Sequence, residues 1–326
     1  MSFAARHWYR LSPVSILLTP LSLVFRALVW LRRASYRFGL LASVRLPVPV
    51  IVVGNLTVGG TGKTPLVLWL AAELRRRGRQ PGVLCRGYGG HHFGAPRAVT
   101  SGDDPAVTGD EALLLAERAR CPVWIGVDRG RAGHALLSAN PECDVIICDD
   151  GLQHYRLLRD FEVAVEDERG LGNCLLLPAG PLREPASRRV DATVVNGGKP
   201  RPGTYAMRLR TTGIYRVCEP EAAVAPSDLS GKRLHAVAAI GNPQRFFAEL
   251  DRIGLAAVTH AFPDHYAYRP QDLEFASCDF VLMTEKDAVK CREFGRRDLV
   301  AVGVDAEPDP ALAELIWSRI DGLAPA

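Results

Sequence analysis

Residues 50–65 read Val50-Ile-Val-Val-Gly-Asn-Leu-Thr-Val-Gly-Gly-Thr-Gly-Lys63-Thr64-Pro65. The β-branched run at the start predicts a buried strand, the glycines predict a turn, and an apolar helical pattern follows. A turn of this kind binds phosphate, because backbone N–H groups surround the anion and the next helix presents its positive end. Lys63 would reach the terminal phosphates, and the Thr64 hydroxyl would be a ligand of Mg²⁺. The stretch therefore predicts a nucleotide-binding strand, loop and helix.

The loop departs from the usual spacing at one position. In the pattern Gly-x4-Gly-Lys-Ser/Thr, the first glycine falls where this chain has Thr57. The doublet Gly59-Gly60 can supply the missing flexibility. A chance Gly-Lys-Thr in an ordinary strand-helix turn is the alternative, but the position after a buried strand favours nucleotide binding. The predicted nucleotide contacts are Thr57, Val58, Gly59, Gly60, Thr61, Gly62, Lys63 and Thr64.

Strand-like and helix-like segments alternate along the rest of the chain. Strand-like runs lie near 48–53, 81–85, 122–127, 144–149, 161–166 and 192–196, and helix-like runs include 65–77, 110–120 and 129–139. A second cycle runs through 234–240, 256–260, 279–284 and 298–303. This alternation predicts an α/β fold with a mostly parallel sheet and helices on both faces. Ligands of such sheets bind at the carboxyl ends of the strands, where the glycine-rich loop lies.

Composition shifts suggest four regions in the chain. Residues 1–46 form a basic apolar segment, and 47–196 form the core that carries the phosphate loop. Residues 197–230 are rich in Pro, Gly and Thr and are expected to be a connector with a possible hairpin. Residues 231–326 form a smaller C-terminal α/β lobe. We expect a cleft between the two lobes.

Composition indicates a folded protein with reduced cysteines. The 326 residues are 48% hydrophobic and 23% charged, which excludes intrinsic disorder. None of the eight cysteines belongs to a Cys-x-x-Cys pair, and several lie in apolar strand-like runs. They are interpreted as core residues of a cytosolic protein and not as metal ligands.

The N-terminal segment is strongly basic and apolar. Residues 1–50 hold seven arginines and no acidic residue, so the rest of the chain sums to −3 within a net charge of +4. Because the residues between these arginines are apolar, an anionic membrane surface is a better partner than nucleic acid, which we do not expect to bind. Residues 11–25 are uncharged, about 22 Å of helix, and short of the ~30 Å hydrocarbon core.

The expected N-terminal helix begins at Ser12 as N-cap, followed by Pro13. Its polar residues Ser15, Thr19, Ser22 and Arg26 recur every three or four positions as one narrow stripe. We expect a helix that lies in the membrane interface with its arginines on lipid headgroups. A single membrane span and a helix packed on its own protein are the alternatives.

A second chemical signal is Asp144-Val-Ile-Ile-Cys-Asp149-Asp150-Gly151. An apolar run that ends in aspartate is typical of a buried strand that delivers a carboxylate to Mg²⁺. Adjacent strand residues point in opposite directions, so Asp149 and Asp150 are expected to have different roles.

Other short motifs follow in order: Arg86-Gly-Tyr-Gly, Gly109-Asp110-Glu111, Asp128-Arg129, Gln153-His154, Arg183-Glu184, Gly241-Asn-Pro, Phe262-Pro-Asp-His265 and Thr284-Glu-Lys-Asp287. Together, over nearly the full length, the set resembles the tetraacyldisaccharide 4′-kinase family. That resemblance implies phosphorylation of a lipid A precursor with ATP at the cytoplasmic face of the bacterial inner membrane, by a peripheral or monotopic enzyme. The family also tends to place serine or threonine where Thr57 stands.

The resemblance also implies roles for individual residues. Residues 57–64 would hold ATP, with Lys63 on its phosphates, and Asp110 would take the proton from the sugar 4′-hydroxyl with His265 tuning its basicity. Thr64, Glu111 and one or both of Asp149 and Asp150 would hold Mg²⁺. The glycolipid and its phosphate region would be lined by Arg129, Gln153, His154, Arg183 and Glu184.

Taken alone, several of these residues have simpler interpretations. Asp110 could only stabilise a helix N-terminus, and His265 could be an ordinary loop histidine. Arg129 and Arg183 could form surface ion pairs. The alternative function is a membrane-associated ATPase switch of the partitioning type, although its loop typically has lysine where this chain has Val58.

Overall fold

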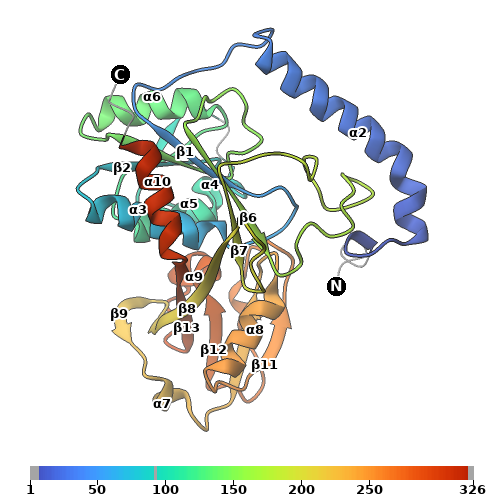
Figure 1. Ribbon diagram of the computed structural model, residues 1–326. Helices are drawn as coiled ribbons and strands as arrows, with labels where there is room; N and C mark the ends of the chain where they lie inside the picture. The colour runs from blue at the N-terminus through green and yellow to red at the C-terminus, as the bar shows by residue number, and fades with distance from the viewer. Residues whose placement is uncertain (1–6, 92–93, 322–326) are drawn as a thin grey trace.

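One continuous sheet runs through the whole molecule (Figure 1). The structure is a computed structural model that describes residues 7–91 and 94–321, so Arg6 of the basic segment lies outside the described residues. The 13-stranded sheet has the order β11-β10-β12-β13-β8-β7-β6-β1-β5-β2-β4-β3, and β9 pairs with β8. All neighbours on this path are parallel except β13–β8 and β4–β3. The predicted fold class is confirmed.

The larger part of the sheet, with its helices, is called the N-terminal half. Its elements are β1 (Val50–Gly54), α3 (Lys63–Arg76), β2 (Pro81–Cys85), β3 (Arg97–Val99), α4 (Pro105–Thr108), α5 (Asp110–Arg118), β4 (Val123–Ile125), α6 (Arg129–Ala139), β5 (Val145–Asp149), β6 (Phe161–Asp167), β7 (Ala192–Asn196), β8 (Tyr205–Arg216) and β9 (Glu219–Ala223). The strand β1 lies at its centre between β5 and β6. The predicted order of strands and helices is therefore observed, and the phosphate loop leaves the middle of the sheet.

The smaller part is called the C-terminal half. It comprises α7 (Pro226–Leu229), β10 (Leu234–Ala238), α8 (Pro243–Arg252), β11 (Val258–Ala261), the 3₁₀ turn η1 (Pro270–Leu273), β12 (Phe280–Thr284), α9 (Glu285–Cys291), the 3₁₀ turn η2 (Arg292–Phe294) and β13 (Leu299–Pro308). Helix α8 packs on one face of its strands and α9 on the other. The antiparallel pair β13–β8 joins the two halves.

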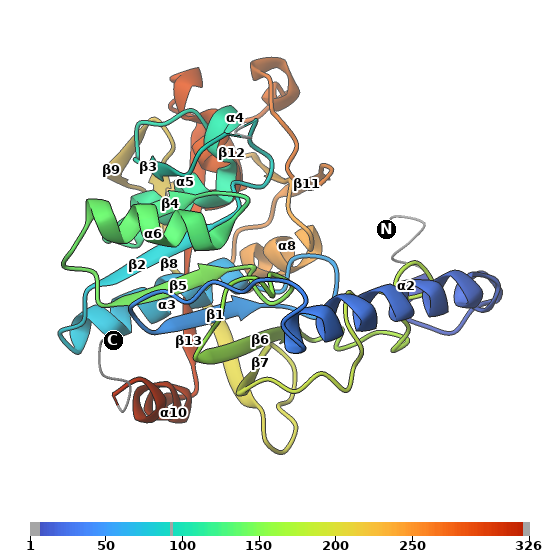
Figure 2. The same cartoon turned by 90° about the horizontal axis from the view of Figure 1, so that it is seen from above.

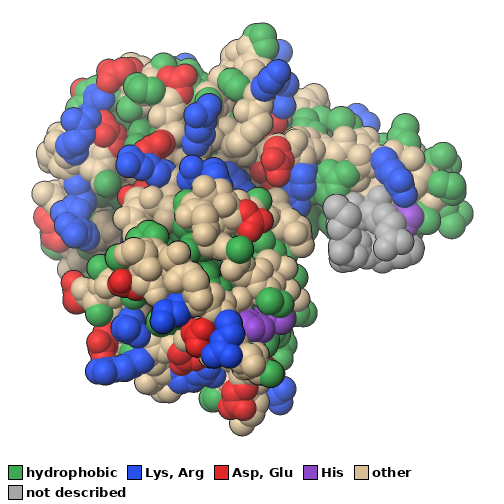
Figure 3. Space-filling view, turned by 90° about the horizontal axis from the view of Figure 1, so that it is seen from below, with side chains coloured by type: hydrophobic (Ala, Val, Ile, Leu, Met, Phe, Trp, Pro, Cys, Tyr) green, Lys and Arg blue, Asp and Glu red, His purple; other side chains and the backbone are tan. Residues whose placement is uncertain are grey.

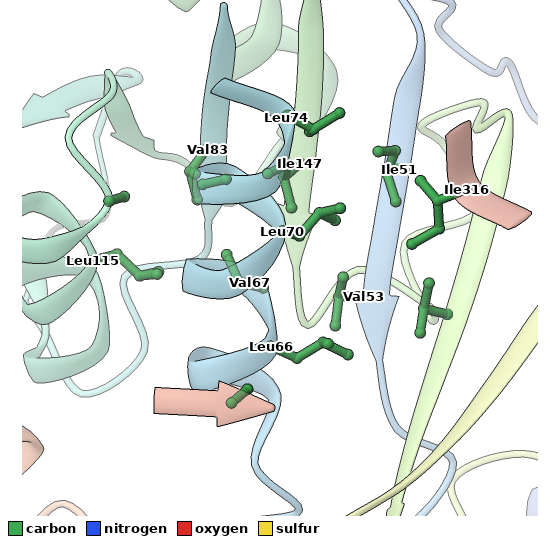
Figure 4. Close-up of a cluster of buried hydrophobic side chains, with 14 of the residues drawn as sticks. Ile51, Val53, Leu66, Val67, Leu70, Leu74, Val83, Leu115, Ile147 and Ile316 are labelled. Carbon is green, nitrogen blue, oxygen red and sulfur yellow. The ribbon is translucent and has the colours of Figure 1, made fainter. Parts of the chain in front are cut away.

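The main core lies between the sheet and α3 (Figure 4). Leu66, Leu70 and Leu74 recur at the helical spacing and are each no more than 2% exposed. They pack on the inward residues of β1 and β5, including Ile51 and Ile147. This packing fixes the helix that begins at Lys63, so the end of the phosphate loop is held by a rigid element.

The last helix returns to the first half. Helix α10 (Pro310–Ile320) follows β13 and buries Leu312, Ile316 and Ile320 in the same cluster as Ile51. A linear division of the chain at residue 231 therefore separates α10 from the core in which it packs. The sequence pattern alone carries no signal for this return.

Helix α2 (Pro13–Arg37) extends away from the body of the molecule (Figures 1 and 2). Ser12 is its N-cap, as predicted. The first part of its polar stripe faces the protein: Ser15 and Ser22 are buried, Ser22 Oγ donates to the Leu176 carbonyl at 2.8 Å, and only Arg26 of the stripe is exposed. Leu17 on the opposite side is 78% exposed. The helix therefore contacts its own protein through Ser15, Ser22 and the partly buried Phe25, and leaves most of its other large apolar side chains exposed.

Hydrophobic side chains gather on this projecting arm (Figure 3). The exposed large apolar residues of the segment are Leu11, Ile16, Leu17, Leu21, Leu23, Val24, Leu28, Trp30, Leu31, Phe38, Leu40 and Leu41. By length and composition alone, α2 is the one helix in the described part of the chain that could cross a membrane. An uncovered apolar surface of this extent is typical of a membrane or protein contact.

Candidate active site

The phosphate loop is built from backbone conformations that glycine adopts readily. Gly59 and Gly62 have φ of +111° and +95°. A methyl group on Gly62 would lie 2.1 Å from Asn196 Nδ2, which donates to the Thr61 carbonyl at 2.8 Å. Gly62 is therefore required both by its conformation and by the close approach of β7.

A cavity of about 1130 Å³ lies over the loop and between the two halves. Its wall includes residues 58–64 and places Arg245 and His265 of the C-terminal half opposite them. The predicted residues in the wall are Val58, Gly59, Gly60, Thr61, Gly62, Lys63, Thr64, Glu111, Arg129, Asp149, Asp150, Gln153, His154, Arg183, Glu184 and His265. Thr57 is 5% exposed and pairs with Leu182, and Asp110 is 4% exposed; neither belongs to this wall.

Lys63 and Arg183 converge on Asp150. The distance from Lys63 Nζ to Asp150 Oδ1 is 3.7 Å, and that from Arg183 Nη1 to Asp150 Oδ2 is 3.1 Å. Burial alone would raise the pKa of Asp150, but the charges of Lys63 and Arg183 hold it below its ordinary value. Asp150 has φ of +47°, so the chain turns sharply after β5. These three charges surround the end of the loop where a terminal phosphate would bind.

Asp149 has a different environment from its neighbour. It ends β5, is 2% exposed, and its Oδ1 atom has no hydrogen-bond partner among the described residues. Burial and the charge of Glu111 raise the pKa of Asp149 to about 7, although Lys63 opposes the shift. The carboxylate is thus held where a positive charge would stabilise it.

The residues present fit a divalent cation that binds together with a nucleotide. Within residues 7–91 and 94–321, no group of three His, Cys, Asp or Glu side chains converges as a complete metal site. Mg²⁺ does not need one, since it usually keeps several waters and takes one or two carboxylates plus substrate phosphates. The unpartnered Asp149 oxygen, Glu111, Asp150 and the Thr64 hydroxyl are the oxygen ligands available at the cavity.

Asp110 and His265 form a pair that joins the two halves. Asp110 begins α5, and its two carboxylate oxygens lie 3.0 and 3.1 Å from His265 Nδ1. Burial would raise the pKa of Asp110, but the His265 hydrogen bond and the charges of Lys286 and Lys290 lower it. Burial likewise opposes the charged imidazole, and the hydrogen bond to Asp110 outweighs it and raises the pKa of His265. The residues are 155 positions apart in sequence.

Two lysines of α9 complete this cluster. Lys286 Nζ lies 2.9 Å from Glu111 Oε1 and 3.3 Å from His265 Nε2. Because an ammonium group only donates, Nε2 accepts in this contact and Nδ1–H donates to Asp110. Lys290 Nζ lies 3.7 Å from Asp110 Oδ2. Residues 284–287 form one of the short sequence motifs, but local pattern assigned Lys286 no role; the i, i+4 spacing of Lys286 and Lys290 was the available signal.

The residues predicted to bind substrate lie together on another part of the wall. The Arg129 backbone N–H donates to His154 Nε2 at 3.3 Å, so the His154 proton is on Nδ1. Burial and the charge of Arg129 lower the pKa of His154 to about 4, which keeps this ring neutral. Gln153 Nε2 donates to Glu184 Oε1 at 3.0 Å, and Arg188 Nη1 donates to Glu184 Oε2 at 3.1 Å. The buried Glu184 thus orients its neighbours.

The site combines a phosphate loop, nearby carboxylates and a hydrogen-bonded Asp–His pair. This combination defines a nucleotide-dependent phosphotransferase of the P-loop class. The family model described as tetraacyldisaccharide-1-P 4′-kinase matches residues 14–321. The chain belongs to this family, and it is a kinase.

Individual relatives agree with the family model. The tetraacyldisaccharide 4′-kinase of Methylobacillus flagellatus is 50% identical over 321 residues, which cover 98% of this chain and 96% of the relative. The enzyme of that name from Pseudomonas aeruginosa is 46% identical over 330 residues and 99% of each chain. A crystal structure of LpxK from Aquifex aeolicus in complex with ATP is similar, with a TM-score of 0.79 and 29% identity. That match covers 94% of this chain and 99% of the other.

Proposed function

We propose that this chain transfers the γ-phosphoryl group of ATP to the 4′-hydroxyl of a tetraacyldisaccharide 1-phosphate, giving lipid IVA and ADP. The observation that carries the proposal is one cavity that has the phosphate loop on one side and the Asp110–His265 pair beside the other. The family membership supplies the substrate class. Phosphoryl transfer needs positioning and charge neutralisation, and this cavity offers both.

The residues of the site have different roles according to their charge. The backbone of residues 59–62 and the ammonium of Lys63 bind the phosphates of ATP. Asp110 accepts the proton of the attacking hydroxyl, while His265 Nδ1–H holds the carboxylate in place. Thr64, Glu111, Asp149 and Asp150 are the groups that would hold Mg²⁺, which when bound neutralises charge on the phosphates.

The disaccharide headgroup is assigned to the wall formed by Arg129, Gln153, His154 and Arg183. The neutral His154 ring and the Gln153 amide offer hydrogen bonds that suit sugar hydroxyls. The arginines offer charge to phosphate oxygens. Glu184, which is 1% exposed, fixes Gln153 in this wall and also accepts a hydrogen bond from the buried Arg188.

We also propose that α2 places the enzyme on the inner face of a bacterial membrane. Phe25, Leu28 and Val29 of α2 line the cavity, while the opposite side of the helix is exposed. An acceptor with acyl chains can therefore leave its chains in lipid while its headgroup enters the cavity. The arginines of the segment, such as Arg26 and Arg37, suit anionic phospholipid.

The product identifies the reaction. Full-length protein, ATP, Mg²⁺ and the tetraacylated disaccharide 1-phosphate should yield a lipid heavier by one phosphate on the distal sugar, detected by mass spectrometry. Lys63→Ala should lower the rate at least about 100-fold because a positioned donor to the phosphates is lost. Rapid ATP hydrolysis without any phosphorylated lipid would favour an ATPase switch and contradict the proposal.

Membrane attachment can be tested on the exposed face of α2. Leu17→Glu combined with Leu21→Glu should release most protein from liposomes that contain anionic phospholipid, because each leucine contributes about 1.5–3 kcal/mol of burial. Vesicle sedimentation measures the bound fraction. Val258→Glu is the matched control, since Val258 is 57% exposed but lies in the C-terminal half. Equal sedimentation of the double variant and wild type would mean that attachment lies elsewhere.

A further inference from the structure

The phosphate loop is held from outside by a second loop, residues 168–183 between β6 and β7, here called the bracing loop. Val58 N–H donates to the Pro181 carbonyl at 2.8 Å, and Arg183 N–H donates to the Leu56 carbonyl at 2.7 Å. Arg169 Nη2 donates to the Gly60 carbonyl at 3.1 Å. The bracing loop therefore holds the backbone at Leu56, Val58 and Gly60.

Arg169 is itself fixed in place. Its Nε donates to Asp167 Oδ2 at 2.8 Å, and Asp167 is 4% exposed at the end of β6. The guanidinium is also close to the glycine turn, because a methyl group on Gly59 would lie 3.6 Å from Arg169 Nη2. A planar donor held by a buried carboxylate loses little further freedom when it binds a carbonyl. Arg169 thus connects the end of β6 to the glycine turn of the phosphate loop.

The N-terminal segment contacts the bracing loop. The Tyr9 ring lies under the Arg169 guanidinium, with 5.3 Å from Cζ to the ring centre. Trp8 Nε1 donates to the Pro178 carbonyl at 3.0 Å, and Asn173 N–H donates to the Trp8 carbonyl at 2.8 Å. The flat face of the Arg169 guanidinium is therefore covered by the segment that precedes α2, while its edge donates to the phosphate loop.

We propose that Arg169 is a positioning residue for the phosphate loop and that Tyr9 stabilises it, so that docking of the N-terminal segment strengthens nucleotide binding. The inference rests on the proposed function, since it concerns the same ATP site. A glycine-rich loop loses backbone freedom when it closes on phosphate. A loop already held at Gly60 loses less, and its affinity for nucleotide is correspondingly higher.

The test is direct binding of a non-hydrolysable ATP analogue with Mg²⁺ to the full chain in detergent micelles, by calorimetry. Arg169→Gln should raise the Kd about tenfold, because a hydrogen bond to a charged donor is lost. At saturating ATP the kcat should stay within about threefold of wild type, and the KM for lipid should not change. Arg169→Lys keeps the positive charge but lacks the planar guanidinium, so its Kd should lie between those of wild type and Arg169→Gln. It replaces Arg169→Gln if that variant does not fold.

Arg201→Gln is the matched control. Arg201 pairs with Glu166, the neighbour of Asp167, at 2.6 Å and does not contact the phosphate loop. Its Kd should equal that of wild type. An unchanged Kd in both Arg169 variants would overturn the proposal, and so would an equal loss in Arg201→Gln.

The link to the N-terminal segment is tested by a double-mutant cycle. Tyr9→Ala should raise the Kd about threefold, and Arg169→Gln with Tyr9→Ala should be no weaker than Arg169→Gln alone. Fully additive losses would refute the coupling. Because the readout is binding, a wild type that binds nucleotide but phosphorylates no lipid would contradict the proposed function and leave the bracing test intact.

Discussion

The two halves of the sheet share one architecture but contribute different groups to the site. The N-terminal half supplies the phosphate loop and the carboxylates of Asp110, Glu111, Asp149 and Asp150. The C-terminal half carries no such loop among its described residues; it supplies His265 and two lysines to those carboxylates. One half therefore binds the reactants, while the other orients the carboxylates that act on them.

The strongest test of this division is Asp110→Asn in the N-terminal half. The change keeps the shape but removes the proton acceptor, so kcat should fall about 1,000-fold while ATP binding changes little. Steady-state kinetics and calorimetry measure the two. Glu117→Gln is the control, because Glu117 lies on the same helix and pairs with Arg292 of the other half at 3.0 Å. Equal losses in kcat and ATP affinity would mean that Asp110 only stabilises the helix end.

A smaller effect is expected from Lys286→Met in the C-terminal half. Without the ammonium, the charge that opposes a second proton on His265 Nε2 is lost, while Nδ1–H still donates to Asp110. The kcat should fall about tenfold with little change in the KM for ATP, and an NMR titration of the imidazole nitrogens should show Nε2 protonated at a higher pH than in wild type. Lys232→Met, on the exposed start of the same half, is the control. Wild-type kinetics in Lys286→Met would mean that the C-terminal half only closes the cavity and does not orient the reacting groups.

The smallest effect concerns stability and pH. Because the folded-state pKa of Asp149, about 7, is above its unfolded value, the folded state favours the protonated form. Its contribution to stability is present at low pH and is lost as pH rises from about 4 to 7. Asp149→Asn should therefore stabilise the metal-free protein by about 1–2 kcal/mol at pH 8 and much less at pH 5. Thermal melts at both pH values measure this, and a gain that is equal at both would contradict it.

Local patterns predicted the parts of the site that are continuous in sequence. The strand, glycine turn and helix around Lys63 follow from residue types that act over a few positions, and the Asp149–Asp150 step at the end of β5 does as well. The pairing of Lys286 with Glu111 spans 175 positions, and no local pattern determines it. It depends on how the C-terminal half packs against α5, which is a property of the complete fold.

The N-terminal helix shows a different limit. The spacing of Ser15 and Ser22 predicted a polar stripe, but it could not say which side would face the protein. For an ordinary soluble helix the apolar side faces the core, and here the polar side does, because it hydrogen bonds to loop carbonyls such as Leu176. The orientation of α2 therefore depends on the bracing loop, whose Leu176 carbonyl accepts the hydrogen bond from Ser22.

The return of α10 to the first half has a consequence for where the chain can be truncated. The chain crosses from one half to the other through β8 and comes back through β13, and Ile316 then closes the core around Ile51. A gene fragment ending before residue 231 would lack Leu312, Ile316 and Ile320 and would leave that core open to water, so the N-terminal half should not fold on its own when the gene is truncated there.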